Sequence, residues 1–482
     1  MAQATWLNPV RIRRHEGALA LLALMACQHL LAVPLAVIAL NAAGAQADGG
    51  RGSLRGGTST AAKLTMNISE RELKDKLSGF WTGQLVGNFM GLPFEFVYME
   101  EPMPFLPNTY FDEQSANASG VRCNHDGRGS IPAKLDELQG AYTDDDTDIE
   151  FVTLHAVLEH GLGLTYPQIA SYWRKYVHIT INGSDALWFA NKKARELMDE
   201  GLLPPLTGSK ANNTWWWTID PQLVNEIWSA FYPGMIEEAV NRAEWGARIT
   251  SSSWGTHATR FYAAAISAAF FATDVDTLYD IAMNFVPADS PFRKGLGQVR
   301  KWRWAHKDWR VTWKNITSNY LRHPDTTCGR DGDFNTCWVS SMINGLLGAM
   351  ALLYGEGDFA KTVGIAIAAG FDCDNQAATL AGLLGVLHGG SRIPRSLTHQ
   401  IAGNNWDQPF NDKYVNERRL PLPRLNRNQV IVDKIMQVAH QAILQGGGSL
   451  GSPQAAEDGS RTYHLRVSPA LARGGGPPPR WL

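Results

Sequence analysis

The sequence has no excess of positive charge. Its 482 residues include 44 Lys or Arg and 46 Asp or Glu, so the formal net charge is −2 and the isoelectric point is near 6.7. A protein without a basic surface does not concentrate the phosphate backbone of a nucleic acid. The apolar–polar alternation of strands is also scarce, which argues against a sandwich or a doubly wound sheet. The sequence therefore predicts neither a nucleic-acid partner nor a sheet-based fold.

Cysteine is scarce as well. The five cysteines lack the close paired spacing that holds structural zinc. One of them, Cys27, lies in an N-terminal segment that we expect to be removed. Cys328 and Cys337 are the local pair that we expect to form a disulfide in an oxidising compartment. Cys373 lies between two acidic residues, and we expect it to be a buried thiol.

A long apolar run is found only near the N-terminus. Three arginines between residues 11 and 14 precede an apolar stretch at about 18–40, and Ala45-Gln46-Ala47 then offers a small-x-small cleavage site. This order predicts that residues 1–47 are a signal peptide and that the mature protein is secreted or otherwise extracytoplasmic, without a membrane attachment. Because the apolar stretch is long, an uncleaved signal anchor stays open as an alternative.

The rest of the chain divides by composition. Residues 48–66, which are rich in Gly, Ser, Thr and Ala, are predicted to be a linker. Residues 446–482 contain glycine and proline triplets and are predicted to be a flexible tail. Between them, residues 67–445 form the predicted domain. Its apolar residues recur at helical spacing, and this pattern predicts helices at 70–90, 149–160, 259–272, 339–353, 362–369, 376–387 and 430–444. We expect an all-α fold, a compact bundle of many helices.

Two acidic clusters precede helical segments. The first holds Asp144, Asp145, Asp146 and Asp148, and the second holds Asp372 and Asp374, followed by Asn375. One or two such residues are explained by capping of a helix N-terminus, but so many carboxylates repel one another unless a cation lies between them. Oxygen ligands without histidine or thiolate favour Mg²⁺, with Mn²⁺ as an alternative.

A glycine-rich helix supplies a third candidate. Gly83, Gly87 and Gly91 recur at helical spacing, which permits close approach of a neighbouring helix, and Pro93 then ends the helix. Glu95 follows the break and can project into a cleft, although a solvated loop carboxylate is the alternative. The segment 331–335 starts like a calcium-binding loop but lacks the later glycine and glutamate ligands, so we expect no calcium there.

The order of these motifs resembles the ADP-ribosylglycohydrolase family, in particular its crystallin J1-like bacterial branch. The similarity rests on the glycine helix that ends at Glu95, the acidic segment that opens a helix, and the stretch 370–389. Segment 353–359 resembles the same branch. The resemblance implies an all-α fold with a cleft that holds two Mg²⁺ ions.

The resemblance also implies which residues bind metal and substrate. The implied metal ligands are Asp144, Asp145, Asp146, Asp372, Asp374 and Asn375. Asp144 and Asn375 replace hydroxyl ligands of the family pattern. Where many members carry a ribose-contacting stretch, this chain has segment 251–257, so Trp254, Gly255 and His257 are the candidate substrate-binding residues. Trp254 or a residue of the run Trp215–Trp217 is a candidate for stacking on adenine.

The implied function is a magnesium-dependent hydrolase that cleaves an N- or O-glycosidic bond to ADP-ribose or a related ribosyl substrate. Its expected partner is a small molecule that contains ADP-ribose, or a protein modified with it. One carboxylate accepts a proton from the attacking water, and the catalytic candidates are Asp145, Asp146 and Glu95. Two alternatives stay open: a two-metal phosphoesterase, and an inactive ADP-ribose-binding or crystallin-like protein.

Overall fold

The computed structural model describes residues 64–123, 139–143, 145, 147–326, 328, 334–401, 404–405, 409–453 and 459–473. All of them belong to one unit of mutual contacts that runs from Thr60 to Leu482. The predicted signal peptide, 1–47, lies outside the described residues, as do Asp144 and Asp146. No helix in the described part of the chain is long and apolar enough to cross a membrane.

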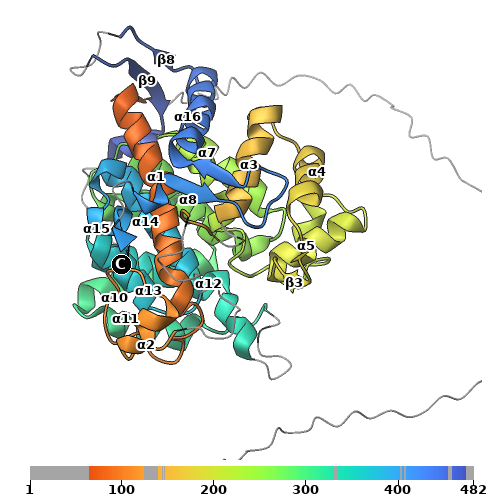
Figure 1. Cartoon of the computed structure of the whole chain (residues 1–482), viewed down its shortest axis with the longest axis vertical. Helices are drawn as coiled ribbons and strands as arrows, with labels where there is room; N and C mark the ends of the chain where they lie inside the picture. Colours follow the sequence, from red (N-terminus) through yellow and green to blue (C-terminus); the bar gives the residue numbers. More distant parts are fainter. Residues whose placement is uncertain are drawn as a thin grey trace, which may run out of the picture. The chain divides into compact units, whose positions relative to one another are not determined.

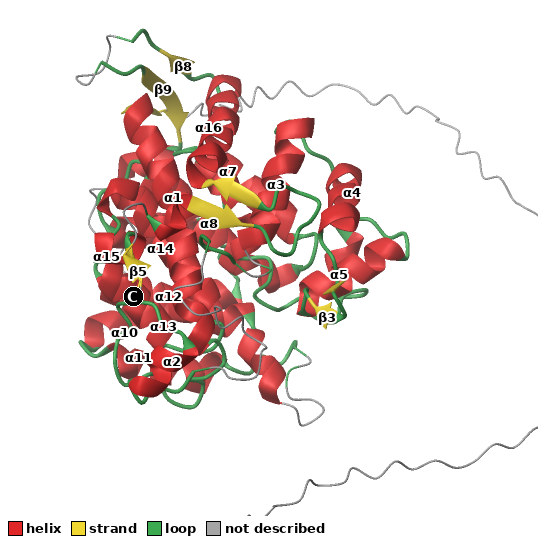
Figure 2. Ribbon diagram, in the orientation of Figure 1, coloured by secondary structure: helices red, strands yellow, loops and turns green. Residues whose placement is uncertain are grey.

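Helices dominate the described chain, as expected for an all-α fold (Figure 2). They are α1 (Glu70–Gly91), α2 (Glu113–Ala118), α3 (Thr147–His160), α4 (Tyr166–Tyr176), α5 (Phe189–Asp199), α6 (Ile227–Phe231), α7 (Ile236–Ala247), α8 (His257–Ala269), α9 (Val275–Asn284), α10 (Pro291–Ala305), α11 (Trp309–Tyr320), α12 (Ser341–Gly355), α13 (Phe359–Ala368), α14 (Cys373–His388), α15 (Arg395–Thr398) and α16 (Asn428–Gln445). The seven predicted helices are confirmed as α1, α3, α8, α12, α13, α14 and α16, with ends shifted by a few residues.

Helices α1 and α14 are packed backbone to backbone (Figure 1). A Cβ atom added at Gly83 would lie 2.2 Å from the carbonyl oxygen of Ala381, and one at Gly87 would lie 2.2 Å from that of Ala377. One added at Gly91 would lie 2.3 Å from a backbone atom of α14. The glycines advance along α1 while their partners retreat along α14, so the two helices are antiparallel. This glycine seam confirms the expected close approach and fixes the C-terminal end of α1 beside the N-terminal end of α14.

Fully buried helices form the core around this seam. Every residue of α12 is buried, and in α14 every residue except His388 is buried. A helix that is apolar all round has no solvent face, so it must be covered on every side. Helices α8, α12 and α13 supply this cover for α14.

Short strands complete the fold, namely β1 (Leu64–Ser69), β2 (Thr180–Ile181), β3 (Ser184–Asp185), β4 (Gln400–Ile401), β5 (Asn404–Asn405), β6 (Lys413–Val415), β7 (Leu425–Arg427), β8 (Ser449–Leu450) and β9 (Thr462–Val467). The largest sheet has the order β1-β9-β8, and β1 pairs antiparallel with β9 from Leu64 opposite Val467 to Ser69 opposite Thr462.

Parts of this sheet lie where we expected irregular chain. Its strands include residues of the expected linker, 48–66, and of the expected flexible tail, 446–482. Residues 64–66 belong to β1, and β8 and β9 lie within the supposed tail. The reason is the alternation in β9, where Tyr463, Leu465 and Val467 are at most 3% exposed. Apolar residues at every second position place one face of a strand on the core.

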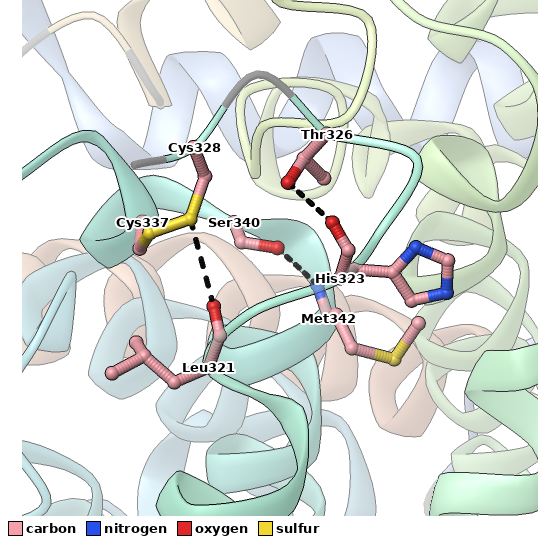
Figure 3. The surroundings of a disulfide bond; sticks show 7 residues. All are labelled: Leu321, His323, Thr326, Cys328, Cys337, Ser340 and Met342. Atoms are coloured by element: carbon pink, nitrogen blue, oxygen red, sulfur yellow. Dashed lines mark hydrogen bonds between the residues drawn. A yellow bond between two sulfur atoms is a disulfide. The ribbon is translucent and has the colours of Figure 1, made fainter. Parts of the chain in front are cut away.

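The expected disulfide is confirmed between Cys328 and Cys337, whose Cα atoms are 4.9 Å apart (Figure 3). The expectation for Cys373 is confirmed as well, since it is buried outside this bond. Burial raises the pKa of the Cys373 thiol well above its usual value, so the group is a protonated thiol at neutral pH.

Candidate metal centre

Three carboxylates converge where the glycine seam ends. Glu95, Asp372 and Asp374 each offer one oxygen, and these oxygens lie within 4.8 Å of one another. Oxygens on opposite sides of a bound Mg²⁺ are about 4.2 Å apart, because each Mg²⁺–oxygen bond is about 2.1 Å long. Adjacent oxygens around the same ion are about 3 Å apart. Oxygens within 4.8 Å of one another can therefore share one cation after modest rotation of the three side chains. An all-carboxylate donor set suits a hard divalent ion.

Backbone constraints hold the two turns that carry these carboxylates. Phe96, which follows Glu95, has a φ of 54° and donates its N–H to the carbonyl of Phe371 over 2.9 Å. Phe371 itself has a φ of 63°, and Gly370 before it has a φ of 72°. Residues other than glycine rarely adopt a positive φ. Each such residue destabilises the fold by about 1–3 kcal/mol, and such residues cluster at functional sites. The hydrogen bond thus joins two strained turns, and Asp372 follows directly from one of them.

Amide side chains contact three residues at the start of α14, namely Asp372, Asp374 and Asn375. Asn88 on α1 donates to Asp374 over 3.2 Å, and Asp374 is 1% exposed. The backbone N–H of Asp372 donates to the side-chain oxygen of Asn344 over 3.1 Å. Gln222 donates to the side-chain oxygen of Asn375 over 3.4 Å. These partners are neutral amides, so they do not cancel the charge of Asp372 and Asp374.

The cluster carries a negative potential. After burial, the largest causes of the raised pKa of Cys373 are the charges of Asp374, Glu95 and Asp372, in that order. The thiolate form of Cys373 is disfavoured because three carboxylates surround it. The same field attracts a cation.

The first acidic segment is only partly described. Asp145 lies in the turn before α3 and is half-buried, while Asp144 and Asp146 fall outside the described residues. Asp148 is 1% exposed and forms a salt bridge of 2.8 Å with Arg419, which is fully buried. Its charge is therefore matched by a guanidinium. The metal-binding roles of Asp144, Asp145 and Asp146 stay predictions.

The candidate substrate-binding residues lie in a packed region. Trp254 is 3% exposed, and its ring meets that of Trp216 edge-on at 5.1 Å between centroids. A Cβ at Gly255 would lie 2.2 Å from the carbonyl oxygen of Trp216. His257 contacts the hydroxyl of Ser290 over 2.7 Å, and burial lowers the pKa of His257 to about 4. Trp254 would have to move to stack on a ligand, so the substrate-binding roles of these residues stay predictions.

Two further carboxyl groups are buried close to each other. Glu150 on α3 and Glu226 before α6 are both fully buried. Glu150 accepts the N–H of Ile227 over 2.5 Å, and Gln84 on α1 donates to Glu226 over 3.4 Å. Burial raises the pKa of Glu226 to about 8. Burial and then the charge of Glu226 raise the pKa of Glu150 well above its usual value.

Sequence reasoning missed this pair, because Glu150 follows the acidic cluster within a helical pattern and Glu226 carries no motif. Only the burial of both carboxyl groups, which the structure shows, distinguishes them from ordinary acidic residues.

Comparison with known proteins gives matches that cover most of the chain. The family model described as ADP-ribosylglycohydrolase matches residues 69–423, which include the glycine seam and all three converging carboxylates. A search of curated proteins finds no match. One similar solved structure is described as an "ADP-ribosylglycohydrolase-related protein complex"; it is 16% identical, covers 77% of this chain and 99% of its own, and has a TM-score of 0.45. The family model matches well over half of the chain, and the chain therefore belongs to the ADP-ribosylglycohydrolase family.

Proposed function

We propose that this protein is a magnesium-dependent hydrolase that cleaves an N- or O-glycosidic bond to ADP-ribose or a related ribosyl substrate. Membership of the family implies glycosidic hydrolase activity that depends on a metal ion. The observation that carries the proposal is the convergence of Glu95, Asp372 and Asp374 within 4.8 Å. The substrate is a small molecule that contains ADP-ribose or a protein that carries it.

Asp372, Asp374 and Glu95 would hold one cation, because one oxygen of each lies within 4.8 Å of the other two. Asp144, Asp145, Asp146 and Asn375 would complete a centre of two ions. Bound Mg²⁺, or Mn²⁺ in its place, would supply electrostatic stabilisation of the ribose hydroxyls and of a water molecule. The proposal therefore assigns six ligands of the acidic segments together with Glu95.

We assign the proton-accepting role to Glu95 first, with Asp145 and Asp146 as alternatives. Glu95 lies on the turn after α1 and is half-buried, so water reaches it, whereas Asp374 is 1% exposed. A carboxylate next to the attacked carbon accepts the proton of water as the glycosidic bond breaks. The hydrogen bond between Phe96 and Phe371 keeps Glu95 close to Asp372 during this step.

The proposal is tested by metal binding and product analysis of the purified protein. Mn²⁺ binding is measured by calorimetry, and ADP-ribose release from ADP-ribosylated arginine and serine peptides is measured by chromatography. We expect Asp372→Asn to weaken Mn²⁺ binding at least tenfold and Glu95→Gln to abolish hydrolysis, with the helical circular dichroism signal intact. Glu100→Gln is the matched control, because Glu100 is exposed five residues beyond Glu95.

Two results would contradict the proposal. Release of inorganic phosphate without release of ADP-ribose would favour a phosphoesterase. Full hydrolytic activity of Asp372→Asn in the presence of a chelator would show that the reaction does not depend on the metal centre.

We also propose that the protein is exported after removal of residues 1–47. The disulfide between Cys328 and Cys337 supports this proposal, because such bonds persist mainly in oxidising compartments. The expectation rests on the order of basic, apolar and small residues at the N-terminus.

A further inference from the structure

We propose that the Cys328–Cys337 disulfide and Asn344 act together to position Asp372, so that reduction of the disulfide by a dithiol weakens divalent-cation binding at the carboxylate cluster. This inference rests on the proposed metal-binding function. Asn344 and the disulfide are positioning elements, because they act on the backbone of the turns that carry the carboxylates. Two chains of contacts, which both begin at Trp338 next to Cys337, link the disulfide to the cluster.

The first chain of contacts runs through Asn344, a fully buried residue of α12. Its side-chain oxygen accepts the backbone N–H of Asp372 over 3.1 Å. Its side-chain nitrogen donates to the carbonyl of Trp338 over 2.7 Å and to that of Ser340 over 3.1 Å. A single amide thus ties the backbone of Asp372 to the residue that follows Cys337.

The second chain of contacts runs through the ring of Trp338. This ring stacks on that of Phe96, with centroids 6.4 Å apart and planes inclined by 29°. Phe96 follows Glu95 and donates its N–H to Phe371, the residue before Asp372. Trp338 is therefore linked to both turns that carry the carboxylates. Its ring contacts the turn of Glu95 through Phe96, and its carbonyl group is linked to Asp372 through Asn344.

The disulfide holds the segment to which Trp338 belongs. Cys337 lies in a 3-10 helix (Phe334–Val339) and is 1% exposed. Ser340 donates its N–H to the carbonyl of Cys337 over 3.2 Å and caps α12 by accepting the N–H of Met342 (Figure 3). Cys328 is half-buried and lies beyond the end of α11. The bond therefore cross-links the segment that precedes α12 to the one that follows α11.

Cys328 is the sulfur that a reductant reaches first, since it is more exposed than Cys337. A thiolate of the dithiol attacks the sulfur of Cys328, the S–S bond breaks, and Cys337 leaves as a thiolate that takes up a proton. The second thiol of the reductant then displaces Cys328 and closes the disulfide of the reductant. Two electrons and two protons pass to the protein, which gains two thiols.

Reduction frees the Trp338 segment from the end of α11. The carbonyl that orients Asn344 and the ring that packs on Phe96 can then shift, and both carboxylate turns lose a fixed neighbour. Residues that orient metal ligands typically account for a factor of about 10–100 in metal affinity. We therefore expect Mn²⁺ to bind about tenfold more weakly to the reduced protein.

The experiment compares Mn²⁺ binding by the oxidised and the reduced full chain. Free Mn²⁺ is measured by electron paramagnetic resonance after dithiothreitol treatment and desalting under argon, and thiols are counted under denaturing conditions to confirm reduction. The double variant Cys328→Ser/Cys337→Ser is the matched control. It should bind Mn²⁺ as weakly as the reduced protein and should not respond to dithiothreitol.

The outcomes separate this inference from the proposed function. Equal Mn²⁺ affinity in both redox states, with two thiols gained, overturns the coupling and leaves the proposed function intact. Absence of Mn²⁺ binding in either state overturns both. If reduction destroys the helical circular dichroism signal, Asn344→Ala decides, because it leaves the disulfide in place. If Asn344→Ala binds Mn²⁺ about tenfold more weakly than wild type, with an altered spectrum of bound Mn²⁺, the inference is supported. If its Mn²⁺ binding equals that of wild type, the inference is refuted.

Discussion

Replacing Glu226 with glutamine should stabilise the protein at alkaline pH but not at acidic pH. Glu226 is fully buried, and burial raises its pKa from 4.5 to about 8. The folded protein therefore keeps this carboxyl group protonated at a pH at which the unfolded chain has lost the proton. A glutamine keeps the shape of the side chain and an oxygen that accepts the hydrogen bond from Gln84.

The sign of the effect follows from proton binding. Between pH 4.5 and 8 the folded state binds one proton more than the unfolded state, so the free energy of unfolding falls as the pH rises. The slope is about 1.4 kcal/mol per pH unit, and the whole interval therefore amounts to about 5 kcal/mol. The stabilising contribution is complete below pH 4.5 and is lost as the pH rises through 8. Glutamine does not titrate, so the variant avoids this loss.

Thermal melts at pH 5 and pH 8 measure the effect. We expect Glu226→Gln to melt within about 1 °C of wild type at pH 5 and about 5 °C higher at pH 8. Glu238→Gln serves as the control, because Glu238 is exposed on α7. If Glu226→Gln melts lower than wild type at pH 8, Glu226 is ionised in the fold and a cation compensates it, which would refute the reasoning.

Three further predictions concern packing, a buried ion pair and processing. Gly87→Ala places a Cβ 2.2 Å from a backbone oxygen of α14, so it should lower the free energy of unfolding by about 2–3 kcal/mol in urea titrations. A Cβ at Gly297 of α10 meets nothing within 4 Å, so Gly297→Ala should raise the free energy of unfolding by about 0.5–1 kcal/mol. Equal effects of the two changes would contradict the glycine seam. Arg419→Met should cost about 3–5 kcal/mol, because it removes the guanidinium that pairs with the buried carboxylate of Asp148. Unfolding curves that match wild type would show that this ion pair does not stabilise the fold. Mass spectrometry of the exported protein should find residues 1–47 absent, and an intact N-terminus in a soluble cytosolic fraction would argue against export.

The features predicted from sequence are those with local signals. The glycines of α1 recur at helical spacing, and this spacing alone predicts a close helix neighbour. The pairing of Cys328 with Cys337 follows from their proximity along the chain. Asp372 and Asp374 flank one residue at a helix start, so their convergence is also local.

The features that the sequence did not predict depend on residues far apart in the chain. Asp148 belongs to an acidic run, and nothing beside it shows that Arg419 neutralises it. The burial of Glu150 against Glu226 requires α3 and the start of α6 to be placed together, and no periodicity of either segment specifies this. Strand β9 did carry a local signal, its alternation of apolar and polar residues, but the glycine- and proline-rich surroundings masked it.

The pairing of β1 with β9 has a consequence for how the chain folds during synthesis. The ribosome releases β1 and α1 first, yet their partners β9 and α14 are among the later segments to emerge. Closing so long a loop is entropically unfavourable, and proteins dominated by such distant contacts fold slowly. The nascent chain therefore stays open, with the glycine face of α1 uncovered, until translation is almost complete. An open chain is also the form that can be threaded through a translocation pore, so slow closure of this topology is compatible with the proposed export.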